Sequence, residues 1–165
     1  MFIKRGDLVA GVQVLATALR ELPEHAFHTR YTEFLGEFAE ALGRYGDTSQ
    51  ALAMIDKALD RSEKHEEGWC IAELLRIKGD ILMKGVGADT AASAEEYFQR
   101  SLDLARRQAA LAWELRAATG LARLWKTQAR NHDAYIMLTQ VYGRFTEGFE
   151  TYDLRTAKAL IDELA

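Results

Sequence analysis

The stretch Gly46-Asp47-Thr48-Ser49-Gln50-Ala51-Leu52-Ala53-Met54-Ile55-Asp56-Lys57-Ala58 contains the pattern that decides the fold prediction. A small residue, Ala51, is followed four positions later by the bulky Ile55 and three positions after that by Ala58. Steps of three and four place these side chains on one face of an α-helix. Asp47 followed by Gln50 resembles a capping box. We therefore expect a helix that begins here and runs to about residue 61.

The same pattern recurs along the chain, with its first member at positions 11, 51, 94 and 134. Its other occurrences are Gly11, Leu15 and Ala18; Ala94, Phe98 and Ser101; and Ala134, Leu138 and Val141. A period near forty residues predicts stacked helical hairpins rather than one closed globular core. Because paired helices approach to about 8–10 Å only where side chains are short, we expect Ala51, Ala94 and Ala134 to mark the crossings.

The composition predicts an all-α chain, because a single proline among 165 residues leaves little to interrupt helices. We expect one domain over residues 1–165. It would consist of a half-hairpin over residues 6–22, hairpins over about 27–61, 66–107 and 110–144, and a cap helix over 151–164. A terminal helix that covers the exposed end of the stack is what a solenoid requires.

Charge and cysteine usage exclude several classes of partner and site. A formal net charge of −4 gives no overall attraction to nucleic acid or to anionic membranes. The single Cys70 excludes an intramolecular disulfide, and we expect a buried structural thiol. No apolar run reaches the ~18 residues of a membrane span, and the MFIKRGD start lacks a signal-peptide core. These features predict a cytoplasmic location, with neither nucleic acid nor membrane as a direct partner.

Several positions resemble the tetratricopeptide repeat (TPR). The second helix of that repeat is commonly introduced by Gly-Asp and a small residue, as in Gly46-Asp47 with Ala51 and in Gly6-Asp7 with Gly11. Its first helix shows a large residue, an apolar-small pair and a further apolar residue. Matching sets are Leu35, Phe38-Ala39 and Leu42, and then Ala118, Leu121-Ala122 and Trp125, whereas Lys78-Gly79 departs from the pattern. The resemblance implies a right-handed superhelix of antiparallel helical hairpins.

The last hundred residues are similar to the C-terminal repeats of large bacterial signalling ATPases. The stretches that carry this similarity are residues 69–80, residues 113–118, residues 142–149 and Asp153-Leu154. The resemblance implies a parent with a nucleotide-binding module and an output domain, either a winged-helix transcriptional regulator or an adenylate/guanylate cyclase. The chain itself contains no G-x-x-x-x-G-K-[ST] phosphate-binding loop.

The first helix of each hairpin would line the inner groove of such a stack. The repeat register places there Glu33, Glu37 and Glu40; Glu73, Arg76, Asp80 and Met83; and Arg116, Thr119, Arg123 and Lys126. One end of this groove is acidic and the other basic, so a peptide or domain of complementary charge would be oriented by it. The alternative is that these charges only solvate an exposed face.

Other residues leave alternatives open. The half-hairpin has no preceding helix to pack against, so its apolar stripe would be uncovered. This stripe, Leu8, Val12, Leu15 and Leu19, predicts self-association as a homodimer through the N-terminal helix. Aromatic residues at 69, 97, 113, 125 and 142 form either a ligand-stacking box or interlayer packing, and we expect packing. His25 and His28 with Glu24 lack a convincing further ligand, so we expect no metal.

The sequence thus favours a protein-interaction and regulatory module of a multidomain bacterial ATPase. A free-standing adaptor or co-chaperone-like scaffold is the alternative. Because no paired catalytic groups are present, we expect no catalytic residues and no cofactor.

Overall fold

The computed structural model describes residues 8–21, 28–85 and 88–165. This part of the chain is all-α, as predicted, and contains no strand. Its helices are α1 (Leu8–Glu21), α2 (His28–Tyr45), α3 (Thr48–Lys64), the short 3₁₀ helix η3 (Gly68–Cys70), α4 (Ile71–Leu82), α5 (Ala88–Arg107), α6 (Leu111–Thr127), α7 (Asn131–Tyr142) and α8 (Tyr152–Leu164).

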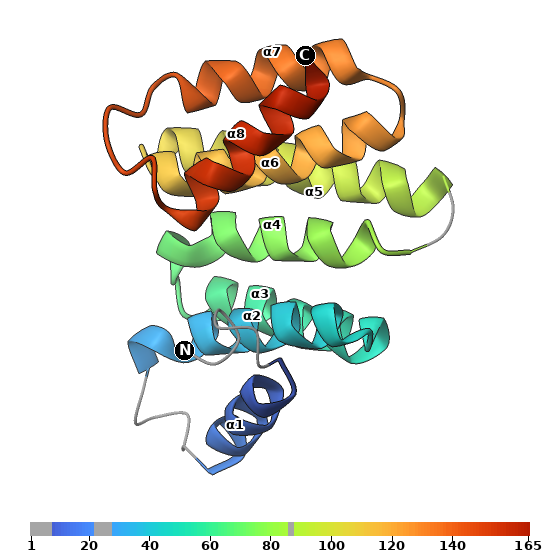
Figure 1. Cartoon of the computed structure of the whole chain (residues 1–165). Helices are drawn as coiled ribbons and strands as arrows, with labels where there is room; N and C mark the ends of the chain where they lie inside the picture. The colour runs from blue at the N-terminus through green and yellow to red at the C-terminus, as the bar shows by residue number, and fades with distance from the viewer. Residues whose placement is uncertain (1–7, 22–27, 86–87) are drawn as a thin grey trace.

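The helices pack in adjacent pairs along the stack (Figure 1). α2 packs with α3, α4 with α5, and α6 with α7, while α8 lies against both helices of the last pair. Contacts also join α2 to α4, α4 to α6, and α6 to α8. These four helices, one from each layer, therefore form a row along one side of the stack. α1 lies at the opposite end and packs against α2.

Local signals account for where the helices begin and end. The Asp47 side chain accepts a hydrogen bond from the Gln50 N–H at 3.0 Å, which confirms the predicted cap of α3. α3 runs to Lys64, three residues beyond the expected end. Gly46 ends α2 with φ +105°, and Ala129 ends α6 in the same left-handed region with φ 60°.

Three of the four recurring triplets lie in the core, as predicted, whereas Leu15 and Ala18 of the first triplet are only half-buried. Ala51, Ile55 and Ala58 are each 0% exposed. The triplets that begin at Ala94 and Ala134 are equally buried, with no member more than 1% exposed. Their side chains divide between an N-terminal cluster, built from α2, α3 and α4, and a C-terminal cluster, built from α5 to α8. The bulky residues Ile55, Phe98 and Leu138 thus fill space between helices.

Glycines bring neighbouring layers close together. A Cβ atom added to Gly79 of α4 would lie 2.9 Å from the Phe98 ring, and one added to Gly120 of α6 would lie 2.5 Å from it. The Phe98 side chain of α5 is therefore held between the backbones of α4 and α6. Gly79 occupies the position at which the TPR pattern expects a small residue, and the contact with Phe98 is the packing reason for a glycine there.

The apolar stripe of α1 is partly covered, contrary to expectation. Val12 and Leu19 pack against the N-terminal cluster, and Leu15 is half-buried. The side chain of Leu8 lies outside the described residues. Val9 and Val14, at 54% and 52% exposure, are the apolar residues that α1 presents to solvent. α2 covers part of this stripe, although we expected α1 to have no helix packed against it.

Within the described part, no helix combines the length and apolar character needed to cross a membrane.

Candidate functional site

The row of α2, α4, α6 and α8 borders a groove of about 560 Å³. Side chains of all four helices line it, so it runs across the layers rather than within one pair. The lining consists of Glu37, Glu40, Gly43, Arg44, Arg76, Ile77, Asp80, Ile81, Met83, Lys84, Arg116, Thr119, Gly120, Arg123, Thr151, Tyr152, Asp153 and Thr156. A more open hollow of about 740 Å³ adjoins it and shares Arg123, Tyr152 and Thr156.

Most of the predicted groove residues come together here. Eight of the eleven line the groove: Glu37, Glu40, Arg76, Asp80, Met83, Arg116, Thr119 and Arg123. Glu73 contacts two of them through ion pairs. Glu33 instead pairs with Arg30 at 2.8 Å, and Lys126 lines the adjoining hollow, where it pairs with Glu163 at 2.6 Å.

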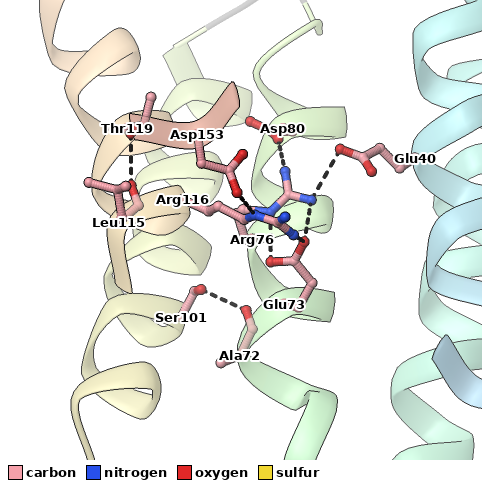
Figure 2. Close-up of polar contacts among 10 residues, drawn as sticks. All are labelled: Glu40, Ala72, Glu73, Arg76, Asp80, Ser101, Leu115, Arg116, Thr119 and Asp153. Atoms are coloured by element: carbon pink, nitrogen blue, oxygen red, sulfur yellow. Dashed lines mark hydrogen bonds and ion pairs between the residues drawn. The ribbon is translucent and has the colours of Figure 1, made fainter. Parts of the chain in front are cut away.

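Arg76 is the centre of the groove's polar contacts (Figure 2). It is 6% exposed, so its charge needs partners that replace water. Nε donates to Glu73 Oε2 at 3.0 Å and Nη2 donates to Glu73 Oε1 at 2.9 Å, a bidentate arrangement. Nη2 also donates to Glu40 Oε1 at 3.1 Å, and Nη1 donates to Asp80. Arg76 thereby joins α4 to α2.

Arg116 continues these contacts toward the C-terminus. Its Nη1 donates to Glu73 Oε1 at 2.9 Å, and its Nε donates to Asp153 Oδ2 at 2.7 Å. Figure 2 shows the resulting series from Glu40 of α2, through Arg76 and Glu73 of α4 and Arg116 of α6, to Asp153 of α8. We call these five residues together with Asp80 the ion-pair ladder. It crosses every boundary between the helices of the row.

The ladder shifts the pKa values of its two α4 carboxyl groups in opposite directions. Burial raises the pKa of Glu73, but Arg76 and Arg116 outweigh burial and hold it below its ordinary value. Burial also raises the pKa of Asp80, and there the charges of Glu40 and Glu73 help to keep it above its ordinary value despite Arg76. For Arg76 itself, burial lowers the pKa, but the surrounding carboxylates raise it well above the ordinary value.

At the centre of the groove, opposite charges are paired rather than separated along it. Glu40, Glu73 and Asp80 surround Arg76, and Arg116 lies between Glu73 and Asp153. These six residues comprise two arginines and four acids, so ion pairing leaves the middle of the groove with a formal net charge of −2.

Exposed cations remain at the edge of the groove. Arg44 and Arg123 are exposed and have no hydrogen-bonded or ion-paired partner within the part of the chain that the structure describes. Lys84 Nζ donates to the Gly43 carbonyl oxygen at 2.6 Å. Burial lowers the pKa of Lys84, and the nearby Arg44 lowers it further, partly offset by Asp80. The exposed positive charge of the groove thus lies at this edge rather than at the centre.

Sequence reasoning missed the contribution of α8. Tyr152, Asp153 and Thr156 line the groove, although we expected this helix only to cover the end of the stack. Tyr152 is 78% exposed at the boundary of the two hollows. The acidic first turn was visible in the sequence, but the direction of the terminal helix depends on contacts with α6 and α7.

Other candidate groups do not form a chemical site. Trp69 and Trp113 lie with ring centroids 6.2 Å apart, whereas Trp125 Nε1 donates to Glu95 at 2.8 Å elsewhere, so the aromatic residues do not form one box. Burial raises the pKa of the Cys70 thiol to about 11, and Cys70 is 2% exposed, which confirms the expected buried thiol. His25 and the side chain of His28 lie outside the described residues.

Glu114 is a buried acid that lies apart from the groove lining. It is 1% exposed, and its carboxylate accepts hydrogen bonds from Arg106 at 3.0 Å and from Arg144 at 2.5 Å. These contacts tie α6 to α5 and to the segment after α7. Among the described residues, no group of three His, Cys, Asp or Glu side chains is placed to hold a metal ion.

Comparison with protein-family models gives no match to the chain, and comparison with curated proteins also gives none.

Proposed function

We propose that the chain is a protein-interaction and regulatory module with a TPR-like superhelical arrangement, and that its groove receives a segment of a partner protein. The observation that carries the proposal is the joint lining of one groove by α2, α4, α6 and α8. A surface built from one helix of each layer is typical of repeat proteins that bind extended segments.

The ion-pair ladder supports a regulatory role for this groove. It links the four helices of the row, so a bound segment that competes for Arg116 or Asp153 would change how adjacent layers pack. A ligand shifts such an equilibrium only by its differential affinity for the two arrangements. Polar groups that bridge every layer provide contacts through which this difference can arise.

We further propose, from the sequence resemblance, that the module belongs to a multidomain bacterial signal-transduction ATPase whose output is transcription or cyclic-nucleotide synthesis. Its partner would then be an inducer protein or another domain of the parent chain. We expect neither catalysis nor a cofactor within these 165 residues. The free-standing adaptor remains the alternative, and the length of the genomic reading frame distinguishes the two.

The binding proposal is tested by peptide display against the full chain and against Thr156→Trp. Thr156 lines the groove and the adjoining hollow, so an indole there fills the binding surface. We expect selected peptides to bind the variant at least about tenfold more weakly. Gln140→Trp, on the exposed face of α7, is the matched control and should leave binding unchanged. Equal affinity for all three proteins, or failure to select any peptide, would contradict the proposal.

A further inference from the structure

Besides the ladder arginines and Lys126, the groove and the adjoining hollow have one basic residue from each helix of the row or from its end. Arg44 lies in the last turn of α2, Lys84 follows the end of α4, Arg123 lies on α6 and Arg155 lies on α8. Arg44, Arg123 and Arg155 are exposed and have no ion-pair or hydrogen-bond partner among the described residues. We call these four residues the cationic edge.

The acids that line the groove are mostly committed to internal partners. Glu40 and Asp80 pair with Arg76, and Asp153 pairs with Arg116. The exposed arginines of the groove and hollow that have no ion-pair or hydrogen-bond partner among the described residues, Arg44, Arg123 and Arg155, therefore lie at the cationic edge. Since surface cations without partners steer and orient a ligand of opposite sign, the complementary ligand is acidic.

We propose that the groove binds an extended acidic segment of a partner protein in which carboxylates recur about every third residue. The inference rests on the groove being the binding site proposed above and adds the chemical class of its partner.

The spacing follows from the geometry of the row. Packed helices lie about 8–10 Å apart, and an extended chain advances about 3.3 Å per residue. One step from helix to helix therefore corresponds to about three residues of the ligand. The three steps from α2 to α8 need a segment of roughly eight to nine residues.

The groove also provides apolar contact between these charges. Ile77, Ile81 and Met83 belong to its lining. Ile77 and Ile81 are each 2% exposed and belong to the N-terminal cluster, so the apolar surface open to a ligand is that of the half-buried Met83. A segment with an aliphatic residue between its carboxylates fits this lining, because its acids reach the cationic edge while an apolar side chain contacts Met83.

The test uses fluorescein-labelled synthetic peptides and fluorescence anisotropy with the full chain. The first probe is Ser-Leu-Glu repeated four times. The second has the same composition with its glutamates contiguous at one end, and the third replaces each Glu with Lys. We expect the first probe to bind at least about tenfold more tightly than the others and to weaken as salt rises from about 50 to about 500 mM.

Charge-reversal variants locate the binding. Arg123→Glu and Arg44→Glu should each weaken binding of the first probe by about tenfold or more. Arg107→Glu is the matched control, because Arg107 is also an exposed arginine near a helix end but lies on α5 outside the groove. It should change affinity less than about twofold. Circular dichroism spectra that match the unsubstituted chain would show that all three variants are folded.

The outcomes separate this inference from the proposed function. If the Lys probe or selected non-acidic peptides bind the chain and the Thr156→Trp variant does not bind them, the proposed acidic class of ligand is wrong but the groove remains a binding site. Equal binding of the spaced and contiguous probes overturns the three-residue spacing. Equal weakening by Arg107→Glu and Arg123→Glu overturns the assignment to the cationic edge. If no probe binds at about 1 mM and display selects nothing, both proposals fail.

Discussion

At the scale of single residues, the environment of Arg76 assigns different roles to two neighbouring carboxylates. Glu73 makes a bidentate contact with Arg76 and also accepts from Arg116, so two cations favour its ionised form. Asp80 contacts Arg76 alone among the ladder cations and lies near two other acids. Burial therefore decides the direction in which the pKa of Asp80 shifts, whereas ion pairing decides the direction for the pKa of Glu73.

Neutral isosteres at these positions should have unequal effects on stability. Glu73→Gln leaves two arginines short of their shared acceptor, and we expect it to lower the free energy of unfolding by about 3 kcal/mol at pH 7. Asp80→Asn removes a charge that burial disfavours, so we expect a loss under about 1 kcal/mol. Urea unfolding measures both values. A loss for Asp80→Asn as large as that for Glu73→Gln would contradict this account.

The same pair predicts the acid dependence of stability. Because the folded-state pKa of Glu73 is lowered, its contribution is present above the ordinary pKa, 4.5, and is lost as the pH falls through the folded value. The raised pKa of Asp80 acts oppositely, since its contribution is full below 3.8 and is lost as the pH rises through the folded value. Between about pH 5 and about pH 3, Glu73→Gln should therefore flatten the loss of stability and Asp80→Asn should steepen it.

A third residue-scale prediction concerns the left-handed end of α6. Ala129 has φ 60°, a conformation that costs a residue with a Cβ about 1 kcal/mol and a glycine almost nothing. Ala129→Gly should therefore raise the free energy of unfolding by up to about 1 kcal/mol. Ala112→Gly, in the exposed first turn of α6, should lower it by a similar amount. Destabilisation by both substitutions in thermal or urea unfolding would refute the argument.

At the scale of helices, the contact of α4, α5 and α6 depends on the absence of two side chains. Gly120→Ala would improve helix propensity by about 1 kcal/mol, but its Cβ would lie 2.5 Å from the fully buried Phe98 ring. Because backbone and ring are both confined, we expect a net loss of about 1–3 kcal/mol. Calorimetry would show this as a lower melting temperature.

A second substitution distinguishes overpacking from other causes of this loss. Phe98→Leu alone creates space and should destabilise, whereas in the Gly120→Ala background it should cost less, because the new methyl group occupies part of that space. Gly68→Ala is the control, since a Cβ there meets nothing within 4 Å and should change stability by less than about 0.5 kcal/mol. Strictly additive effects of the two core substitutions would count against the steric explanation.

The elements show which parts of the fold are legible in the sequence. Helix periodicity, the Asp47 cap and the triplets predicted the helices and their pairing, because each signal acts within a few residues. The roles of Gly79 and Gly120 were hidden, since a glycine inside a helix is informative only when the opposing side chain is known. The cover of the α1 stripe likewise depends on the angle between α1 and α2, which no local pattern specifies.

The candidate site divides in the same way. The repeat register placed eight of eleven proposed residues in the groove lining, because the inward face of each first helix follows from periodicity. The ion-pair ladder was not predicted. Its contacts join residues 36, 43 and 37 positions apart, and a charged residue's sequence neighbourhood does not indicate such a partner. Hence the lining was accessible from sequence but its internal charge balance was not.

At the scale of the whole molecule, two hydrophobic clusters meet at α4. Leu74, Ile77 and Ile81 of this helix belong to the N-terminal cluster, while Gly79 on the same helix meets Phe98 of the C-terminal cluster. The ion-pair ladder crosses the same boundary through Glu73 and Arg116. Stability in a stack of this kind is approximately a sum of layer and neighbour-interface contributions, so the layers need not open together.

This arrangement predicts a graded order of local opening in hydrogen exchange. Among the described residues, the C-terminal cluster contains 17 buried hydrophobic residues and the N-terminal cluster 11, whereas α1 adds only partly buried ones. Since opening energy rises with the apolar surface exposed, amides of α1 should exchange first, those of α2 and α3 next, and those of α6 last. Exchange measured by mass spectrometry in increasing urea resolves these steps.

Because Glu73 links α4 to α6, Glu73→Gln should lower the opening energy of α2 and α3 relative to that of α6. Simultaneous exchange of α1 and α6 at every urea concentration would show instead that the stack opens only as a unit.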